Sequence, residues 1–196
     1  MAPRAMSLAM GLVLASACAG TKLAQVWKAP DPGPRPTKVL VVAVVPQEMA
    51  RRSLEGEFAQ QLQGRGLEVG RGSDLAPEGK PLDRAGVEAL VRRDGFDAVL
   101  VSRYAGTKDS TSYVPVGPTT MGFYGAYDSF YGTAYGPGQT VQNETVSVET
   151  LLYRTEGEGR LVWSTLSETF NPTSPYAAIN ELGGAVMERM VKDGVL

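Results

Sequence analysis

Glu149 and Glu168 are the residues of this sequence whose type and placement could support acid–base chemistry. They fall on two successive strand-like segments, and a pair of carboxylates is what glycoside hydrolysis requires. The sequence contains no histidine, which removes the commonest general base and both the Ser–His and the Cys–His nucleophile pairs. We interpret the two glutamates as solvated strand residues and expect no catalytic site, with a carboxylate-dependent cell-wall hydrolase as the alternative.

The glycine-rich and basic motifs depart from known ligand-binding sequences. Gly79-Lys80 is followed by proline instead of Ser or Thr, and Gly64-Arg65-Gly66 follows a helical segment instead of a strand. We interpret Arg51-Arg52 and Arg92-Arg93 as surface charges of helices. One cysteine, no histidine and a formal net charge of −2 predict no metal cluster, no cofactor and no nucleic-acid partner.

Cys18 is the most informative single residue. Met1 to Arg4 carries a positive charge and the residues up to position 17 are small and apolar, which predicts a secretory signal peptide over residues 1–17. The sequence around Cys18 resembles the bacterial lipobox, in which the cysteine becomes the first mature residue and carries lipid. In Ala15-Ser16-Ala17 the last two residues match that motif, whereas the first stands where leucine is commoner. The alternative is ordinary signal-peptidase cleavage, because the same three residues form an Ala-x-Ala site.

A lipidated Cys18 predicts both a partner and a compartment. Its acyl chains would attach the protein to a membrane, at about 0.8 kcal/mol for each buried methylene. Ala19 follows the cysteine, and in Gram-negative envelopes a residue other than Asp there resembles the signal for outer-membrane delivery. We therefore expect a protein anchored to the periplasmic face of the outer membrane.

Residues 18–37 are predicted to form a lipidated N-terminus and an extended tether. From Ala29 to Thr37 proline occupies every second position, which excludes a helix or a central strand and favours polyproline II. At about 3.1 Å per residue such a tether could span on the order of 60 Å. Trp27 lies within it, and we expect its ring to dock on the domain or at the lipid interface, with a recognition role as the alternative.

Residues 38–196 are predicted to form a single α/β domain. Lys38 to Val45 is an unbroken apolar run after its first residue, which is typical of a strand buried on both faces. The later elements predict one mixed sheet, βαβαβ followed by an antiparallel hairpin and a C-terminal helix, with helices packed on its faces. The expected elements are a helix over 46–64, strand Leu67–Arg71, helix Arg84–Asp94, strand Asp97–Tyr104, strands Thr140–Thr155 and Arg160–Phe170, and a helix from Pro175 to Gly194.

A Tyr/Gly-rich loop is predicted at about residues 105–139. Tyrosine with glycine is a composition typical of binding surfaces, because it supplies contact area and hydrogen-bonding tips at low side-chain entropy cost. Three interpretations stay open: a surface for a partner or for self-association, a cover folded back over the sheet, and a disordered segment. The candidate partner-binding residues are Tyr113, Phe123, Tyr124, Tyr127, Phe130, Tyr131 and Tyr135.

Most of the mature chain resembles a family of uncharacterised bacterial lipoproteins. The resemblance implies an envelope location but carries no known reaction. More distantly, the order of elements is similar to that of small periplasmic domains such as the TolB N-terminal domain and the curli secretion channel, which is an analogy of fold alone. The residues that carry the family resemblance are Val26-Trp27-Lys28-Ala29-Pro30, Lys38 to Val45, Arg51-Arg52 with Glu55, Phe96 to Val101, the Tyr/Gly stretch, Glu149 to Tyr153, Leu161 to Ser164, and Ser167-Glu168-Thr169.

Together these features predict a lipid-anchored binding or structural domain of the bacterial envelope. Its partner would be another envelope protein or a further copy of itself. An oligomeric component of an envelope secretion or channel assembly is the alternative.

Overall fold

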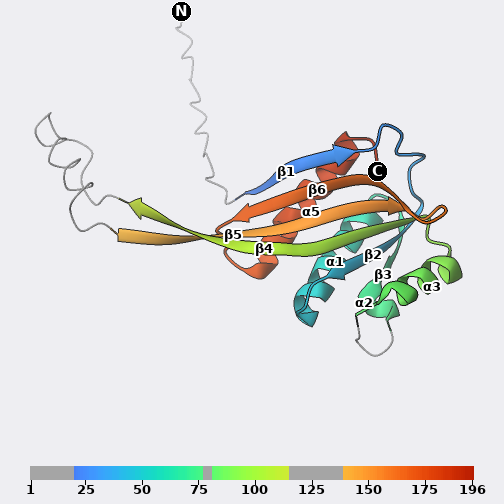
Figure 1. Ribbon diagram of the computed structural model, residues 1–196, viewed down its shortest axis with the longest axis horizontal. Helices are drawn as coiled ribbons and strands as arrows, with labels where there is room; N and C mark the ends of the chain where they lie inside the picture. Colours follow the sequence, from blue (N-terminus) through green and yellow to red (C-terminus); the bar gives the residue numbers. More distant parts are fainter. Residues whose placement is uncertain (1–19, 77–80, 115–138) are drawn as a thin grey trace, which may run out of the picture.

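The computed structural model describes residues 20–76, 81–114 and 139–196, which form one mixed six-stranded sheet with helices on both faces (Figure 1). The sequence prediction of a single-sheet α/β fold is therefore confirmed. The strands are β1 (Thr21–Lys28), β2 (Lys38–Val44), β3 (Glu68–Arg71), β4 (Ala98–Val114), β5 (Gln139–Arg154) and β6 (Arg160–Phe170), and the helices are α1 (Glu48–Gln63), α2 (Gly72–Leu75), α3 (Arg84–Asp94) and α5 (Pro175–Lys192).

The strand order is β1-β6-β5-β4-β2-β3. β2 pairs in parallel with β3 and β4, as the handedness of the two crossovers predicts, whereas β4, β5, β6 and β1 are antiparallel neighbours. Two predicted helix starts are confirmed, because the side chain of Asp83 accepts from the Gly86 amide and that of Ser174 accepts from the Ala177 amide.

Alternate residues of β2 enter two separate cores, which explains why the strand carries no polar face. Val39, Val41 and Ala43 belong to the larger core, with α1 and α5. Leu40 and Val42 belong to the smaller core under α3. α1 and α5 approach closely in the larger core, since a Cβ built on Gly183 would lie 2.5 Å from Cγ of Glu57. A Cβ built on Gly184 would meet nothing within 4 Å, so the close contact is made at Gly183.

Strand β1 replaces part of the predicted tether. The tether prediction is wrong for Thr21–Lys28, which pairs with β6 along one edge of the sheet. The proline segment after it also lies on the domain, because Arg160 donates to the carbonyl oxygen of Asp31 and Arg154 to that of Pro34. The strand carries little period-2 signal because Gln25 has a φ of 53° and interrupts the register.

The predicted loop at about 105–139 is wrong at its N-terminal end, whereas the strand predicted from Thr140 is confirmed to within one residue. β4 continues to Val114 and β5 begins at Gln139, so these two strands extend well beyond β6 and β1 (Figure 1). We call this extension the arm: Lys108–Val114 of β4 paired with Gln139–Thr145 of β5. Its β4 half was not predicted because Lys108–Ser112 is polar on both parities and gives no alternating apolar pattern.

Candidate functional site

The predicted site residues fall mostly outside the described part of the chain. Cys18 precedes it, and six of the seven aromatic candidates lie between its second and third ranges. Tyr113 lies in β4, paired with Thr140, and so belongs to the arm instead of the predicted loop. The six outside the described residues are Phe123, Tyr124, Tyr127, Phe130, Tyr131 and Tyr135.

The chain enters the sheet at the end from which the arm projects. Thr21 pairs with Thr169 of β6, and Thr169 pairs with Val146 of β5. Val146 in turn pairs with Thr107, the last residue of β4 before the arm. The Thr21 and Thr169 hydroxyls are hydrogen-bonded at 2.8 Å, which fixes the edge strand at this point. The first described residues and the base of the arm therefore share one end of the sheet, which we call the anchor end.

Asn171 braces the base of the arm. Its φ is 45°, in the left-handed region that asparagine tolerates better than most residues. Its amide donates to the carbonyl oxygen of Glu144 at 2.8 Å, and its side-chain Oδ1 accepts from the Glu144 amide at 2.8 Å. The side-chain Nδ2 also donates to Oδ1 of Asn143 at 2.7 Å. One residue past β6 thus continues the pairing of β5 to the point where the arm leaves the sheet.

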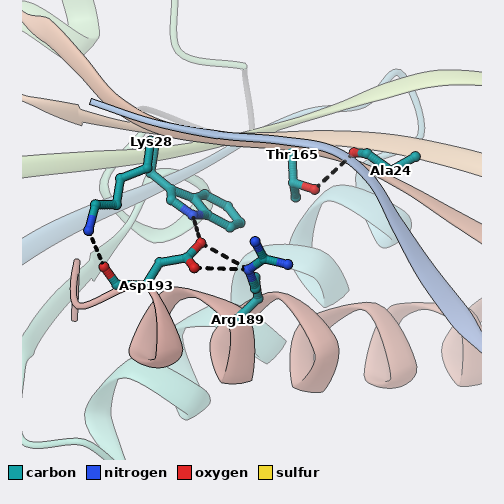
Figure 2. A network of polar contacts seen from close by, with 6 residues as sticks. Ala24, Lys28, Thr165, Arg189 and Asp193 are labelled. Carbon is teal, nitrogen blue, oxygen red and sulfur yellow. Dashed lines mark hydrogen bonds and ion pairs between the residues drawn. The ribbon is translucent and has the colours of Figure 1, made fainter. Parts of the chain in front are cut away.

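A polar network at the opposite end of β1 joins three elements (Figure 2). Nε1 of the fully buried Trp163 donates to Oδ2 of Asp193 at 2.8 Å, and Nε of Arg189 donates to both carboxylate oxygens at 3.0 Å. Nζ of Lys28 donates to the backbone oxygen of Asp193 at 2.7 Å. The network therefore ties the edge strand β1 to β6 and to the end of α5.

The network lowers the pKa of Asp193. Burial by itself raises that pKa, but the hydrogen bonds from Trp163 and Arg189, together with the charges of Arg189 and Lys28, lower it by more. A carboxyl whose folded-state pKa is depressed stabilises the fold above its unfolded pKa of about 3.9, and that contribution is lost as the pH falls through the folded pKa.

We expect Asp193→Asn to lower the free energy of unfolding by about 1–2 kcal/mol at pH 7, because the ion pair with Arg189 is lost and one carboxylate oxygen is replaced by an NH₂ group that cannot accept. The difference from the wild type should shrink below about pH 4. Urea unfolding at a series of pH values measures it, with Glu158→Gln, an exposed carboxylate of the β5–β6 turn, as control. A difference that stays constant down to pH 2 would contradict the linkage.

A cleft of about 390 Å³ lies at the carboxyl end of β2. Its polar lining includes Arg51 and Glu55 of α1, Ser73 of α2 and Tyr104 of β4. Helices α1 and α3 pack in different cores on either side of β2, so this is the switch point where α/β sheets commonly bind ligands. The surface-charge interpretation of Arg51-Arg52 is wrong for Arg51, which is only 5% exposed.

Glu55 closes the floor of this cleft. Its side chain is 1% exposed, and its two carboxylate oxygens accept from the Ala43 amide at 2.9 Å and from the Ser73 amide at 2.6 Å. The carboxylate therefore fastens the short helix α2 to the end of β2. Sequence reasoning did not select Glu55 as a site residue, although its position four residues after Arg51 on one helix face was a usable signal.

The two glutamates considered for catalysis lie on one face of the sheet. Ser147 pairs with Glu168 and Glu149 with Leu166, so the two carboxylates belong to diagonal neighbours of β5 and β6. Glu149 forms an ion pair with Arg103 of β4, and neither glutamate lines the 390 Å³ cleft. Among the described residues, we find no cluster of three or more His, Cys, Asp or Glu side chains placed to hold a metal ion. Nor does any described helix have the length and apolar character needed to cross a membrane.

No protein-family model and no curated protein matches this chain. Solved structures with a similar fold include the PelC dodecamer from Paraburkholderia phytofirmans, with 15% identity, 85% of this chain and 94% of that chain covered, and a TM-score of 0.49. Lipoprotein GNA1162 from Neisseria meningitidis is similar over 80% of this chain and 99% of its own, with 19% identity and a TM-score of 0.44. Likeness at this level concerns the arrangement of strands and helices and says nothing of function.

Proposed function

We propose that the protein is a lipid-anchored domain on the periplasmic face of the outer membrane, where it acts as a binding or structural component. The observation that carries this proposal is the register at the anchor end, which places Thr21 and the base of the arm at the same end of the sheet. A lipid on Cys18 would then hold the arm next to the membrane.

Chain length limits how far the anchor can lie from the sheet. Only Ala19 and Gly20 separate Cys18 from Thr21, so the Cα atoms of Cys18 and Thr21 are at most about 11 Å apart. The arm continues for seven residue pairs past Thr107, which is about 24 Å at 3.4 Å per residue. Because the arm is longer than the segment from Cys18 to Thr21, an arm that points toward the membrane reaches the membrane surface. It must meet the membrane surface or lie along it.

This arrangement differs from the long stalk that the proline pattern predicts. Because β1 and the proline segment pack on the domain, the body is held close to the lipid instead of at a distance of tens of ångströms. An attachment of so few residues restricts the orientation of the domain as well as localising it. The arm thereby becomes the part of the protein best placed to contact other envelope components at the membrane.

Cys18→Ser tests the proposal. We expect the variant to leave the membrane fraction and appear with soluble periplasmic proteins, because one substitution removes every acyl chain. Mass spectrometry of the wild-type protein should find residue 18 as the first mature residue, carrying lipid. Thr21→Ser is the matched control and should stay in the membrane. An unmodified mature N-terminus, or a Cys18→Ser variant that remains membrane-bound, would overturn the proposal.

A further inference from the structure

We infer that the arm pairs, edge to edge, with the arms of neighbouring copies of this chain, and this inference rests on the proposed lipid anchor. On the β4 side, pairing with β2 stops at Arg103, and from Tyr104 to Val114 no described strand other than β5 pairs with β4. On the β5 side, pairing with β6 stops at Thr145, and no described strand other than β4 pairs with Gln139–Gln142.

In the β4 half of the arm the described side chains are open to solvent on both faces, whereas in the β5 half Asn143 is only 6% exposed and is hydrogen-bonded to Asn171. Lys108, Asp109 and Ser110 are exposed, as is Thr107 at the base, and Tyr104 just before it is 45% exposed. No described element of the same chain covers them. A two-stranded ribbon is marginally stable in water by itself, and long open edges act as templates for further strands. An arm of seven residue pairs therefore calls for a partner strand on each side.

The two open edges are complementary to each other. β4 and β5 run antiparallel, so the β4 edge of one arm can pair with the β5 edge of the next as an ordinary antiparallel ladder. This contact is heterologous, with different surfaces on the two copies, and repeating it around an axis leaves no open edge if the ring closes. No other protein is needed to supply either strand.

Lipid attachment at Cys18 favours pairing of β4 with the neighbour's β5 over a twofold pairing of two β4 edges. Pairing two β4 edges antiparallel would point the two arms in opposite directions and send the two Cys18 residues to opposite ends of the dimer. Pairing β4 with the neighbour's β5 keeps all arms parallel, so that every anchor end faces the same way. Lipids inserted in one leaflet demand that second arrangement. The geometry therefore points to a cyclic assembly whose axis is normal to the membrane.

Two deletions separate the arm from the segment beyond it. One variant replaces residues 115–138 with Asn-Gly, which joins Val114 to its partner Gln139. The other replaces Lys108–Thr145 with Asn-Gly, which joins Thr107 to its partner Val146. In detergent, light scattering should give the multimeric mass of the wild type for the first variant and the mass of one copy for the second, which must still unfold in one cooperative transition. A one-copy mass for the first variant or the wild type would overturn the inference.

Crosslinking in intact cells tests the geometry. A lipidated Cys18 has no free thiol, so Ser110→Cys on β4 and Thr140→Cys on β5 can be expressed separately or together and treated with a bismaleimide. We expect dimers when the two single variants are co-expressed and a ladder of multimers in the double variant, but no dimer in either single variant alone. Dimers in a single variant would indicate the twofold arrangement, and crosslinks only to a different protein would identify another partner. Either result overturns the inference.

Lipid anchoring at Cys18 and self-pairing of the arms can be refuted independently of each other. A Cys18→Ser variant that stays in the membrane refutes the proposed function, whatever the light scattering gives. A lipidated wild type with a one-copy mass refutes the self-pairing of arms alone.

Discussion

Trp163→Ala is expected to lower the free energy of unfolding by about 3–5 kcal/mol, a large part of the roughly 5–15 kcal/mol that stabilises a domain of this kind. Trp163 is 0% exposed and belongs to the core that unites β2 with α1 and α5. Its removal leaves a cavity the size of an indole ring. It also takes away the donor to Asp193, and with it the link between β6 and the end of α5.

Trp163→Phe separates the hydrogen bond from the packing. We expect it to cost about 1–3 kcal/mol, since the ring still fills most of the site while the partly buried Asp193 carboxylate loses a donor. Trp27→Phe is the matched control on the neighbouring strand, because Trp27 is 46% exposed. The chain has only these two tryptophans, so Trp27→Phe also leaves Trp163 as a single fluorescent reporter of unfolding. Equal losses in the two phenylalanine variants would contradict the role given to the Asp193 network.

The sequence predicts the helices and the buried strands well because their signals are local. The apolar run from Lys38 becomes β2, and the Glu156-Gly157-Glu158-Gly159 turn joins β5 to β6. In α1 the prediction is less accurate, since the apolar residues at positions 50, 54, 58 and 62 suggest a stripe that includes Ala50. The observed buried face is shifted by about one residue and includes Arg51 and Glu55. A charged pair on a buried face has no hydropathy signal.

The anchor end could not be predicted, for two physical reasons. In β1 the irregular backbone at Gln25 places Leu23 and Val26, three residues apart, against the same core, so neither a strand nor a helix period appears. In the β4 half of the arm, Lys108–Ser112 is polar at every position, so its sequence shows no strand period. Both segments are edges, where tertiary pairing and not burial of one face decides the structure.

The two segments that the sequence did not predict, β1 and the β4 half of the arm, change the functional interpretation more than any confirmed element. With a free tether, the Tyr/Gly segment would sample a wide volume and its direction would not matter. With β1 fixed against β6, the distance from Cys18 to the sheet is short and the arm has a defined direction relative to the first residues of β1. The candidate site thus moves from a loop of aromatic residues to a pair of strand edges.

Glu55→Gln is expected to lower the free energy of unfolding by about 2–3 kcal/mol. Both carboxylate oxygens accept backbone amides, from Ala43 and from Ser73. A glutamine amide can accept only one of these bonds and sets its NH₂ donors against the other N–H. The unpaired amide lies where Glu55 is 1% exposed, so water cannot replace the bond without opening the structure.

The loss of local stability should be largest at α2. Among the described hydrogen bonds, the Glu55 carboxylate is the only side-chain group that links the Ser73 amide to β2. Native-state hydrogen exchange should therefore show the Ser73 amide opening more readily in Glu55→Gln, while amides in the β5–β6 ladder change only with the global stability. Glu48→Gln, an exposed glutamate in the first turn of the same helix, should change stability by no more than about 0.5 kcal/mol and leave Ser73 protected. If Glu55→Gln and Glu48→Gln exchange alike at Ser73, the carboxylate does not hold the floor of the cleft, and α2 must be kept in place by its apolar contacts.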